Sequence, residues 1–334
     1  MTNLPASPSN SRPPFTLGPS AQVHRRLPVT VLAWFVLTAS AIGQQTPTAQ
    51  QAPPAKKQAT PIVKEDVSLE TKDGVLMKAT YYPGKHGKET VPVILVHGFG
   101  GNRQDLSNLA AFLQSEVGGG NAVIVPDLRG HGDSLRRRGV EKALASDRFT
   151  PAEFKAMLWD VEAAKKFLME KNNKSELNIE KLCVVGCELG ALVAANWARV
   201  DWSFPPLATG KQGQDVKALV LISPQETFKG LRMVDAVTDK NVKSKLAVLI
   251  AVGNGDSKAV KEADKLFDQF KRFHPDPAKV EDQDLEPFAA NTKLQGAKLV
   301  LSDEFGLQKA IGVFIKARLA NQALPWKNRP NPLQ

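Results

Sequence analysis

The chain has 334 residues, of which 42% are hydrophobic and 23% are charged, and its formal net charge at pH 7 is +10. This composition is ordinary for a globular protein, and the length allows one large domain or two small ones. The basic residues are spread along the sequence without a nucleic-acid-binding motif, so nucleic acid is excluded as an expected partner.

Residues 1–43 have the layout of a secretory signal peptide. Two arginines precede an apolar run at 27–42, and small residues lie at the end of that run. Sixteen residues that include a proline are short for the roughly 20 that a membrane-spanning helix needs. We therefore expect cleavage after Ala41 or Gly43 and export to the periplasm or the medium, with an uncleaved anchor as the alternative.

Residues 44–61 are rich in Gln, Pro, Ala and Thr, which predicts a flexible linker before the folded domain. Loss of the signal peptide removes three arginines and no acidic residue, which leaves a net charge of +7. This basic character favours an anionic partner, either a small molecule or a component of the cell envelope, whose identity is unknown. Contact with a membrane is expected only through an uncleaved leader.

Short apolar runs alternate with helical patterns between residues 62 and 320, which predicts one domain over that range, followed by a loose tail at 321–334. Continuous β-branched runs indicate strands that are covered on both faces, as in a parallel sheet with helices above and below. The expected strands are 67–71, 75–82, 91–98, 121–128, 181–186, 216–223, 246–253 and 292–301. The expected helices are 104–117, 151–171, 189–200, 257–273 and 306–320. The first two strands have no helix between them, which predicts an antiparallel hairpin at one edge.

The chain contains two cysteines, Cys183 and Cys187, both in or just after an expected strand. A separation of four residues in a strand puts their Cα atoms about 13 Å apart. A disulfide needs less than about 7 Å, so no intrachain bond is expected and the core alone must stabilise the fold.

Four motifs follow the carboxyl ends of expected strands, where open α/β sheets bind their ligands. They are VILVHGFGGN at 93–102, VPDLRGHGDS at 125–134, VVGCELGA at 184–191 and AVGNGDS at 251–257. Each motif leaves a strand and turns through glycines into a loop or helix.

These motifs, in this order, resemble the α/β-hydrolase superfamily, in particular its serine-hydrolase branches similar to peptidase S33 and dienelactone hydrolase. The resemblance covers residues 62–320. It implies the α/β-hydrolase fold, a mostly parallel eight-stranded sheet with helices on both faces and an antiparallel edge strand. It also implies a nucleophile elbow of the form G-x-S-x-G, followed along the chain by an acid and then a histidine.

The resemblance assigns roles to residues of this chain. Position 188 is that of the nucleophile and Asp256 that of the acid, and the oxyanion hole consists of the N–H groups of Leu189 and of Phe99 or Gly100. The residues that the resemblance places in structural parts of the motifs are His97, Gly98, Asp127, Arg129, Gly130, Gly132, Gly186 and Gly190.

The nucleophile position departs from the family pattern because it holds Glu188. A shifted register with Cys187 as nucleophile would need small residues two positions before and after it, and these are valine and leucine. The glycines at 186 and 190 therefore fix the register on Glu188, and Cys187 is expected to point into the core beneath the turn.

The histidine is missing as well. It is expected after the last strand, at about 295–306, and that stretch contains none. The last histidine is His274, which we expect on the surface about 20 Å away at the far end of the helix 257–273. His97 and His131 lie nearer the pocket in loops where the family uses histidine structurally, and His131 is the candidate for a substitute base.

A glutamate has no proton to lose as a nucleophile and attacks acyl carbons poorly. Relatives with aspartate at this position form an alkyl ester that the histidine then helps to hydrolyse, so Glu188 without a histidine could be alkylated only once. As a structural hypothesis, its carboxylate fills the oxyanion hole at the helix N-terminus. Asp256, with no imidazole to orient, is expected to be an ordinary carboxylate or to bond neighbouring backbone.

The sequence therefore favours an exported, non-catalytic protein of this fold with a binding or assembly role, without a cofactor or metal ion. Two alternatives remain open. One is an ester or amide hydrolase that uses His131 as its base, and the other is an enzyme in which Glu188 attacks alkyl halides or epoxides.

Overall fold

The computed structural model describes residues 61–207, 210–275 and 284–329. The expected signal peptide and all but the last residue of the expected linker lie outside these ranges, so cleavage and export stay predictions. No helix in the described ranges is both long enough and apolar enough to cross a bilayer.

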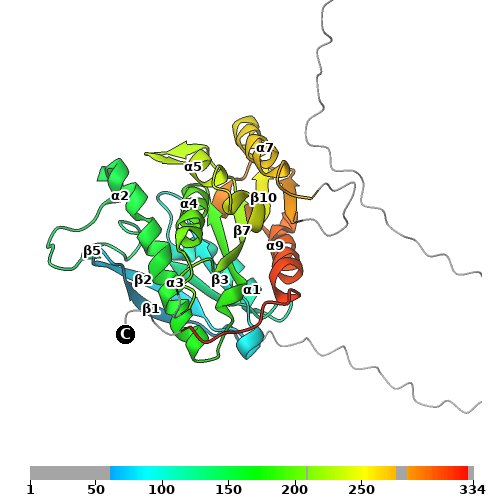
Figure 1. The fold of residues 1–334 in the computed structure, drawn as a ribbon. Coiled ribbons are helices and arrows are strands. Elements are labelled where there is room, and N and C mark those ends of the chain that lie inside the picture. The colour runs from blue at the N-terminus through cyan, green and yellow to red at the C-terminus, as the bar shows by residue number, and fades with distance from the viewer. Residues whose placement is uncertain (1–60, 208–209, 276–283, 330–334) are drawn as a thin grey trace, which may run out of the picture. The chain divides into compact units, whose positions relative to one another are not determined.

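One mixed sheet forms the centre of the domain, with the strand order β1-β2-β4-β3-β6-β7-β10-β11 (Figure 1). The strands are β1 (Glu65–Glu70), β2 (Val75–Tyr82), β3 (Pro92–Val96), β4 (Ala122–Pro126), β6 (Leu182–Cys187), β7 (Val216–Ile222), β10 (Ala247–Gly253) and β11 (Leu285–Ala290). β2 is antiparallel to both β1 and β4, and the strands from β4 to β11 are parallel to one another. A short ninth strand, β5 (Arg136–Arg137), pairs with β2. The expected mostly parallel sheet with an antiparallel edge is confirmed.

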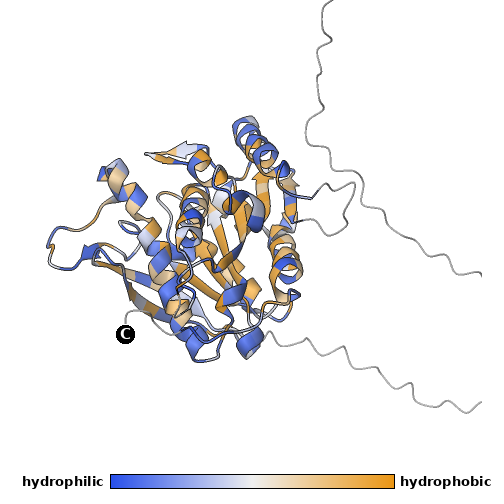
Figure 2. Ribbon diagram, viewed as in Figure 1, coloured by the Kyte–Doolittle hydropathy of each residue, from blue (hydrophilic) through white to orange (hydrophobic). Residues whose placement is uncertain are grey.

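Helices cover both faces of the sheet and turn their apolar sides towards it (Figure 2). The helices are α1 (Ser107–Gln114), α2 (Pro151–Ala156), α3 (Leu158–Asn173), α4 (Leu189–Ser203), α5 (Met233–Val237), α6 (Val242–Lys245), α7 (Ser257–Lys271), α8 (Gly296–Leu301) and α9 (Leu307–Ile315). α3, α4 and α7 share one core with the sheet, and α1, α8 and α9 share the other. A two-stranded ribbon, β8 (Thr227–Phe228) and β9 (Leu231–Arg232), follows β7.

Side chains of β6 alternate between the two cores, as the period of a strand requires. Val184 belongs to the core under α3 and α4, whereas Cys183 and Cys187 belong to the opposite core. Both cysteines are free and fully buried, so the expected absence of a disulfide between them is confirmed. Cys187 lies beneath the turn that follows β6, as expected.

The helix expected at 151–171 begins where the sequence predicts. Thr150 caps it in a reciprocal capping box with Glu153. The helix is interrupted at Met157, whose N–H bonds the carbonyl of Phe154 while its own carbonyl accepts from Asp160 N–H, both three residues apart. This tighter local turn divides the expected helix into α2 and α3.

The last expected strand, 292–301, is wrong. The last strand is β11, which pairs with β10 from Val248 opposite Leu285 to Gly253 opposite Ala290. β11 lies at the sheet edge and is only partly buried, so it needs no continuous apolar run and tolerates Pro287. Much of the apolar run assigned to that strand instead forms α8.

The described part of the C-terminal tail is not loose. Trp326 Nε1 donates to the carbonyl of Asn172 at 3.2 Å, and the backbone of Arg329 exchanges hydrogen bonds with the Asn173 side chain. The Arg329 side chain is buried against Asp215. Contacts to α3 therefore extend the folded domain past residue 320 to 329.

Candidate functional site

The turn between β6 and α4 has the geometry of a nucleophile elbow. A Cβ atom on Gly186 would lie 2.3 Å from the carbonyl oxygen of Gly190, and one on Gly190 would lie 2.3 Å from that of Val96. Glu188 stands at the tip with φ 52° and ψ −112°, a conformation that costs a non-glycine residue free energy. The two glycines allow the close backbone approach, and the side chain at 188 is the one that the turn presents.

The Glu188 carboxylate lies between two glycines of other loops. A Cβ on Gly98, after β3, would be 2.5 Å from Glu188 Oε2, and a Cβ on Gly296, at the start of α8, would be 2.7 Å from Glu188 Cδ. The carboxylate occupies the room that these missing side chains leave. Burial raises the pKa of Glu188, and the nearby ammonium of Lys298 lowers it by less.

The expected filling of the oxyanion hole by Glu188 lacks the hydrogen bonds that it requires. Across residues 61–207, 210–275 and 284–329, no N–H group donates to the Glu188 carboxylate, those of Phe99, Gly100 and Leu189 included. These three N–H groups also donate to no other protein acceptor in the same ranges. The carboxylate lies against the two glycines instead.

The loop after β11 holds Gln295 and Gly296 near the elbow. Gln295 Oε1 accepts from Ser223 Oγ at 2.6 Å, and its Nε2 donates to the carbonyl of Gly253 at 2.8 Å. Gly296 N–H donates to Ser223 Oγ at 2.9 Å. The loop is thereby tied to the ends of β7 and β10, and it brings glycine, not imidazole, against Glu188.

Asp256 follows β10 in the acid position and serves as the N-cap of α7. Its Oδ1 accepts from the backbone N–H groups of Lys258 at 2.9 Å and Ala259 at 3.1 Å. These bonds satisfy donors that the first helical turn leaves open. As expected for a carboxylate with no imidazole to orient, Asp256 bonds neighbouring backbone.

Both ring nitrogens of His97 form hydrogen bonds with backbone groups. Its Nδ1 lies 2.7 Å from the carbonyl oxygen of Gly98, and its Nε2 accepts from Leu128 N–H at 3.0 Å. Burial lowers the pKa of His97 to about 4. With both ring nitrogens bonded to backbone, His97 has no nitrogen available to take a proton from a substrate.

His131 is the one histidine near the elbow with an unbonded ring nitrogen in the described residues. Nδ1 contacts the carbonyl oxygen of Arg129 at 3.0 Å, whereas the buried Nε2 has no partner. Its ring meets those of His97 and Phe99 edge-on, at centroid distances of 5.2 and 5.6 Å. Burial lowers the pKa of His131, and no carboxylate in the described ranges bonds its ring to orient it.

His274 is not a surface residue, contrary to expectation. It is buried, and its Nδ1 lies 2.8 Å from Asp284 Oδ1 just before β11. The Asp284 carbonyl accepts from Val248 N–H at the amino end of β10. His274 therefore lies near the amino end of β10, opposite the elbow, as the helix length predicted, but it is buried there.

The loop after β4 is held by buried ion pairs. Asp127 accepts from the N–H groups of Arg103 at 2.6 Å and Asp133 at 2.9 Å, and it also pairs with the Arg103 guanidinium. Arg129 is fully buried between Asp160, at 2.7 Å, and Asp73, at 2.7 Å. The loop's Gly130 and Gly132 both have positive φ. These residues shape the loop and present no free catalytic group.

Ser223 and Gln295 are parts of the site that the sequence analysis did not find. Serine and glutamine are common in loops, so neither residue carried a signal, and the misplaced last strand hid the loop that holds Gln295. In the described ranges, no cluster of three or more His, Cys, Asp or Glu side chains is arranged to hold a metal ion.

Comparison with known proteins agrees with this geometry. A family model described as the alpha/beta hydrolase fold matches residues 91–272, more than half of the chain. The chain therefore belongs to the alpha/beta hydrolase family. No curated protein sequence matches it significantly.

Solved structures with the same fold include two archaeal esterases and a bacterial dienelactone hydrolase. The Pyrococcus furiosus esterase is 18% identical, with a TM-score of 0.55, and the match covers 80% of this chain and 97% of the esterase. The Pyrobaculum calidifontis esterase is 17% identical, with a TM-score of 0.54 over 77% of this chain and 86% of that one. The Anabaena variabilis dienelactone hydrolase is 14% identical, with a TM-score of 0.53 over 77% and 99%. At these identities the likeness shows the fold alone.

Proposed function

We propose that this protein is a non-catalytic member of the alpha/beta hydrolase family that uses the former active site to bind a ligand or partner. One observation carries the proposal. The Glu188 side chain stands at the nucleophile position and packs against Gly296, in the loop after the last strand where the catalytic histidine is expected. Glu188 thus replaces the nucleophile, and Gly296 lies in the loop where the histidine base is expected, so both groups that acyl transfer needs are replaced.

The chemistry of the remaining groups supports this proposal. Acyl transfer needs a nucleophile and a base that takes its proton and returns it to the leaving group. Glu188 has no hydroxyl or thiol to activate, and Asp256 is occupied as a helix cap. A surviving scaffold without these groups binds substrate-like molecules but has no route to turn them over.

The preserved donors indicate what such a ligand contains. The N–H groups of Phe99, Gly100 and Leu189 have no protein acceptor in the described ranges, and Leu189 opens helix α4, whose N-terminus favours negative charge. Burial raises the pKa of Glu188, which weakens the preference of this group for its charged form. We infer a ligand with a carbonyl or carboxylate oxygen.

An aromatic wall lies beside these donors. Phe99 is 42% exposed, and its ring lies 5.1 Å from that of Phe228 and 6.1 Å from that of Phe154, measured between ring centroids. Such a wall accepts the apolar body of a ligand whose polar end meets the N–H groups. We further propose export after cleavage near residue 43, to be tested by determining the N-terminus of the protein recovered from the envelope or medium.

Hydrolysis of short-chain p-nitrophenyl esters tests the proposed loss of catalysis. Wild type and Glu188→Gln are compared at equal concentration, with the heat-unfolded protein as the background. Equal, background-level rates are expected, because neither side chain supplies a nucleophile and base. Repeated turnover by the wild type that Glu188→Gln removes would overturn the proposal.

His131 and Glu188 define the two alternatives that remain. The unpartnered Nε2 of His131 is the observation that favours an unorthodox hydrolase, and esterase activity lost in His131→Gln would support it. A carboxylate nucleophile predicts a covalent adduct on Glu188 after incubation with an epoxide. Mass spectrometry of the Glu188 peptide distinguishes the carboxylate-nucleophile hypothesis from the unorthodox hydrolase and from the non-catalytic protein.

A further inference from the structure

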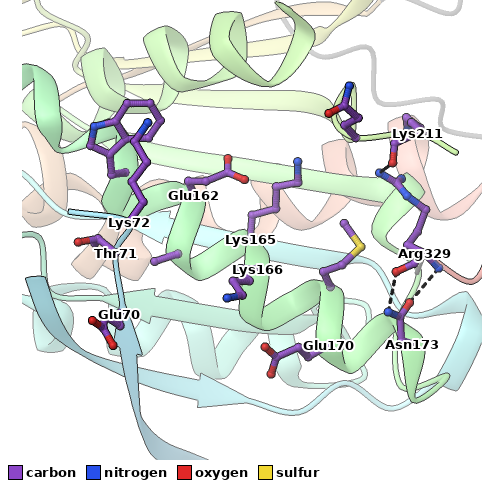
Figure 3. Close-up of a pocket in the computed structure, with 14 residues that line it drawn as sticks. Glu70, Thr71, Lys72, Glu162, Lys165, Lys166, Glu170, Asn173, Lys211 and Arg329 are labelled. Carbon is purple, nitrogen blue, oxygen red and sulfur yellow. Dashed lines mark hydrogen bonds between the residues drawn. The ribbon is translucent and has the colours of Figure 1, made fainter. Parts of the chain in front are cut away.

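A cavity of about 480 Å³ lies along α3, away from the elbow (Figure 3). Its lining residues on α3 recur every three or four positions, so they share one face of the helix. They are Trp159, Glu162, Ala163, Lys165, Lys166, Met169, Glu170 and Asn173. The turn at 70–72, the segment at 211–212 and Arg329 complete the lining. The volume is within the range of small-molecule sites, and no lining residue belongs to the elbow or to the loops around it.

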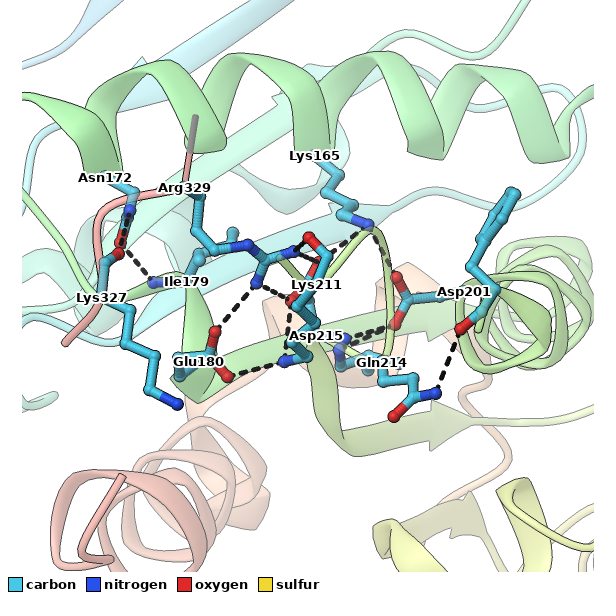
Figure 4. Close-up of polar contacts among 12 residues, drawn as sticks. Lys165, Asn172, Ile179, Glu180, Asp201, Lys211, Gln214, Asp215, Lys327 and Arg329 are labelled. Atoms are coloured by element: carbon cyan, nitrogen blue, oxygen red, sulfur yellow. Dashed lines mark hydrogen bonds and ion pairs between the residues drawn. The ribbon is translucent and has the colours of Figure 1, made fainter. Parts of the chain in front are cut away.

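Buried ion pairs hold one wall of this cavity (Figure 4). Lys165 Nζ lies 2.7 Å from Asp201 and 2.9 Å from Asp215. Arg329 Nη1 lies 2.6 Å from Asp215 and 2.8 Å from Glu180. These residues come from α3, the end of α4, the segments before β6 and β7, and the tail, so the wall is fixed before any ligand arrives.

The ion pairs also cancel the positive charge that the lining suggests. The third cation of this wall, Lys211, pairs with Glu180 at 2.6 Å and with Asp215 at 2.9 Å. Three cations thus face three carboxylates. The other charged lining residues are Lys72, Lys166, Glu70, Glu162 and Glu170, and of these Glu70 pairs with Arg138. With Arg138 counted beside its partner Glu70, six cations and six carboxylates surround the cavity, a net charge of zero. Lys165, Lys211 and Arg329 are all paired, so this wall offers an anion no unpaired positive charge.

The ammonium group of Lys72 lies over the face of the Trp159 ring in the cavity. Lys72 Nζ lies 3.0 Å from the centroid of the Trp159 ring, and Lys72 has no carboxylate within ion-pair distance in the described part of the chain. Lys72 is exposed and carries its ammonium at the end of a long aliphatic stem, whereas Trp159 is half-buried on α3. The ring therefore binds a cation through its π face, and the cation on it is replaceable.

We propose that this cavity binds a small organic cation, a primary or quaternary ammonium compound, whose charged group replaces the Lys72 ammonium on the Trp159 ring. The aliphatic part of the ligand lies against Ala163 and Met169. The carboxylates of Glu162 and Glu170 complement its charge. The proposal does not rest on the proposed function, since it involves none of the residues of the elbow.

Titration calorimetry with choline chloride and with 1,5-diaminopentane tests the proposal on the full chain, with sodium phosphate and glucose as anionic and neutral comparisons. Saturable binding of the two cations is expected. Lys72→Met keeps the apolar stem and removes the competing charge, so it should tighten choline binding about two- to fivefold. Lys72→Arg keeps a competing cation and should give no such gain, and Trp159→Leu should abolish binding.

The outcomes separate this proposal from its rivals. Phosphate binding that weakens in Lys72→Met would establish an anion site and overturn it, as would glucose binding lost in Trp159→Leu. Absence of saturable choline binding in both wild type and Lys72→Met would also overturn it. Thermal unfolding of each variant shows whether a loss of binding reflects a loss of the fold.

Discussion

The packing of Glu188 between two glycines predicts a specific coupling between residue 188 and each glycine. A methyl group at Gly98 would lie 2.5 Å from Glu188 Oε2, the far end of a flexible side chain, so Gly98→Ala should cost about 1 kcal/mol. At Gly296 the methyl group would meet Glu188 Cγ at 2.9 Å and Cδ at 2.7 Å, and the backbone φ is +55°. Gly296→Ala should therefore cost about 1–2 kcal/mol for the backbone and about 1–3 kcal/mol for the overlap.

Shortening residue 188 separates these two contributions. In a Glu188→Ala background the overlapping atoms are gone, because the remaining Cβ is in ordinary contact with Gly98 at 3.6 Å. Gly98→Ala should then be nearly neutral, whereas Gly296→Ala should retain the backbone cost of about 1–2 kcal/mol. The two double-mutant cycles, measured by urea unfolding, should each give a coupling of about 1 kcal/mol or more.

Additive effects would refute this reasoning. If Gly98→Ala and Gly296→Ala destabilise the Glu188→Ala protein as much as the wild type, the carboxylate does not lie between the two glycines. The loop after β11 would then be free to hold a different group near the elbow.

Three further predictions concern the core, the tail and the elbow. Burial lowers the pKa of His97 to about 4, below its unfolded value of about 6.5, so its contribution to stability is present above pH 6.5 and is lost as the pH falls towards 4. The slope should be up to about 1.4 kcal/mol per pH unit in urea unfolding, and His97→Gln should flatten it. Arg329→Met breaks a buried ion pair and should cost about 3 kcal/mol of stability. This is the low end for such a change, because Lys211 still pairs with Asp215 and Glu180. Lys327→Ala, at an exposed position on the same tail, should change stability by less than about 0.5 kcal/mol. Glu188→Ser should leave p-nitrophenyl ester hydrolysis at the background rate, because a serine hydroxyl without an imidazole is not activated. A rate well above background would show that another base serves the elbow.

The sequence predicts the sheet well because the strands that build its centre are covered on both faces. Runs such as β4 and β10 are apolar at nearly every position, which few other structures require. The glycines at 186 and 190 predict the elbow for a similar reason, since only glycine fits the approach that the turn demands. In both cases one local constraint dominates the choice of residue.

The elements that the sequence analysis missed are those fixed by contacts distant in sequence. β11 is a half-exposed edge strand whose pattern carries no clear period, and its identity depends on pairing with β10. The burial of Arg329 depends on carboxylates about 115 and 150 residues earlier.

The orientation of Glu188 could not be predicted for a related reason. The sequence places a carboxylate beside N–H donors, and a hydrogen bond to them is the simplest expectation. In the structure the carboxylate lies against Gly98 and Gly296 and accepts no hydrogen bond from these N–H groups. Gly296 is in contact only because Ser223 and Gln295 tie its loop to β7 and β10.

The pH dependence of p-nitrophenyl acetate hydrolysis, with substrate in large excess over the native protein, measures the central claim directly. A protein without an acyl nucleophile and base should release no more p-nitrophenol than its unfolded form at any pH from 5 to 9. Many turnovers per molecule, with a rate that rises through an apparent pKa near neutrality and falls to background in His131→Gln, would contradict the account.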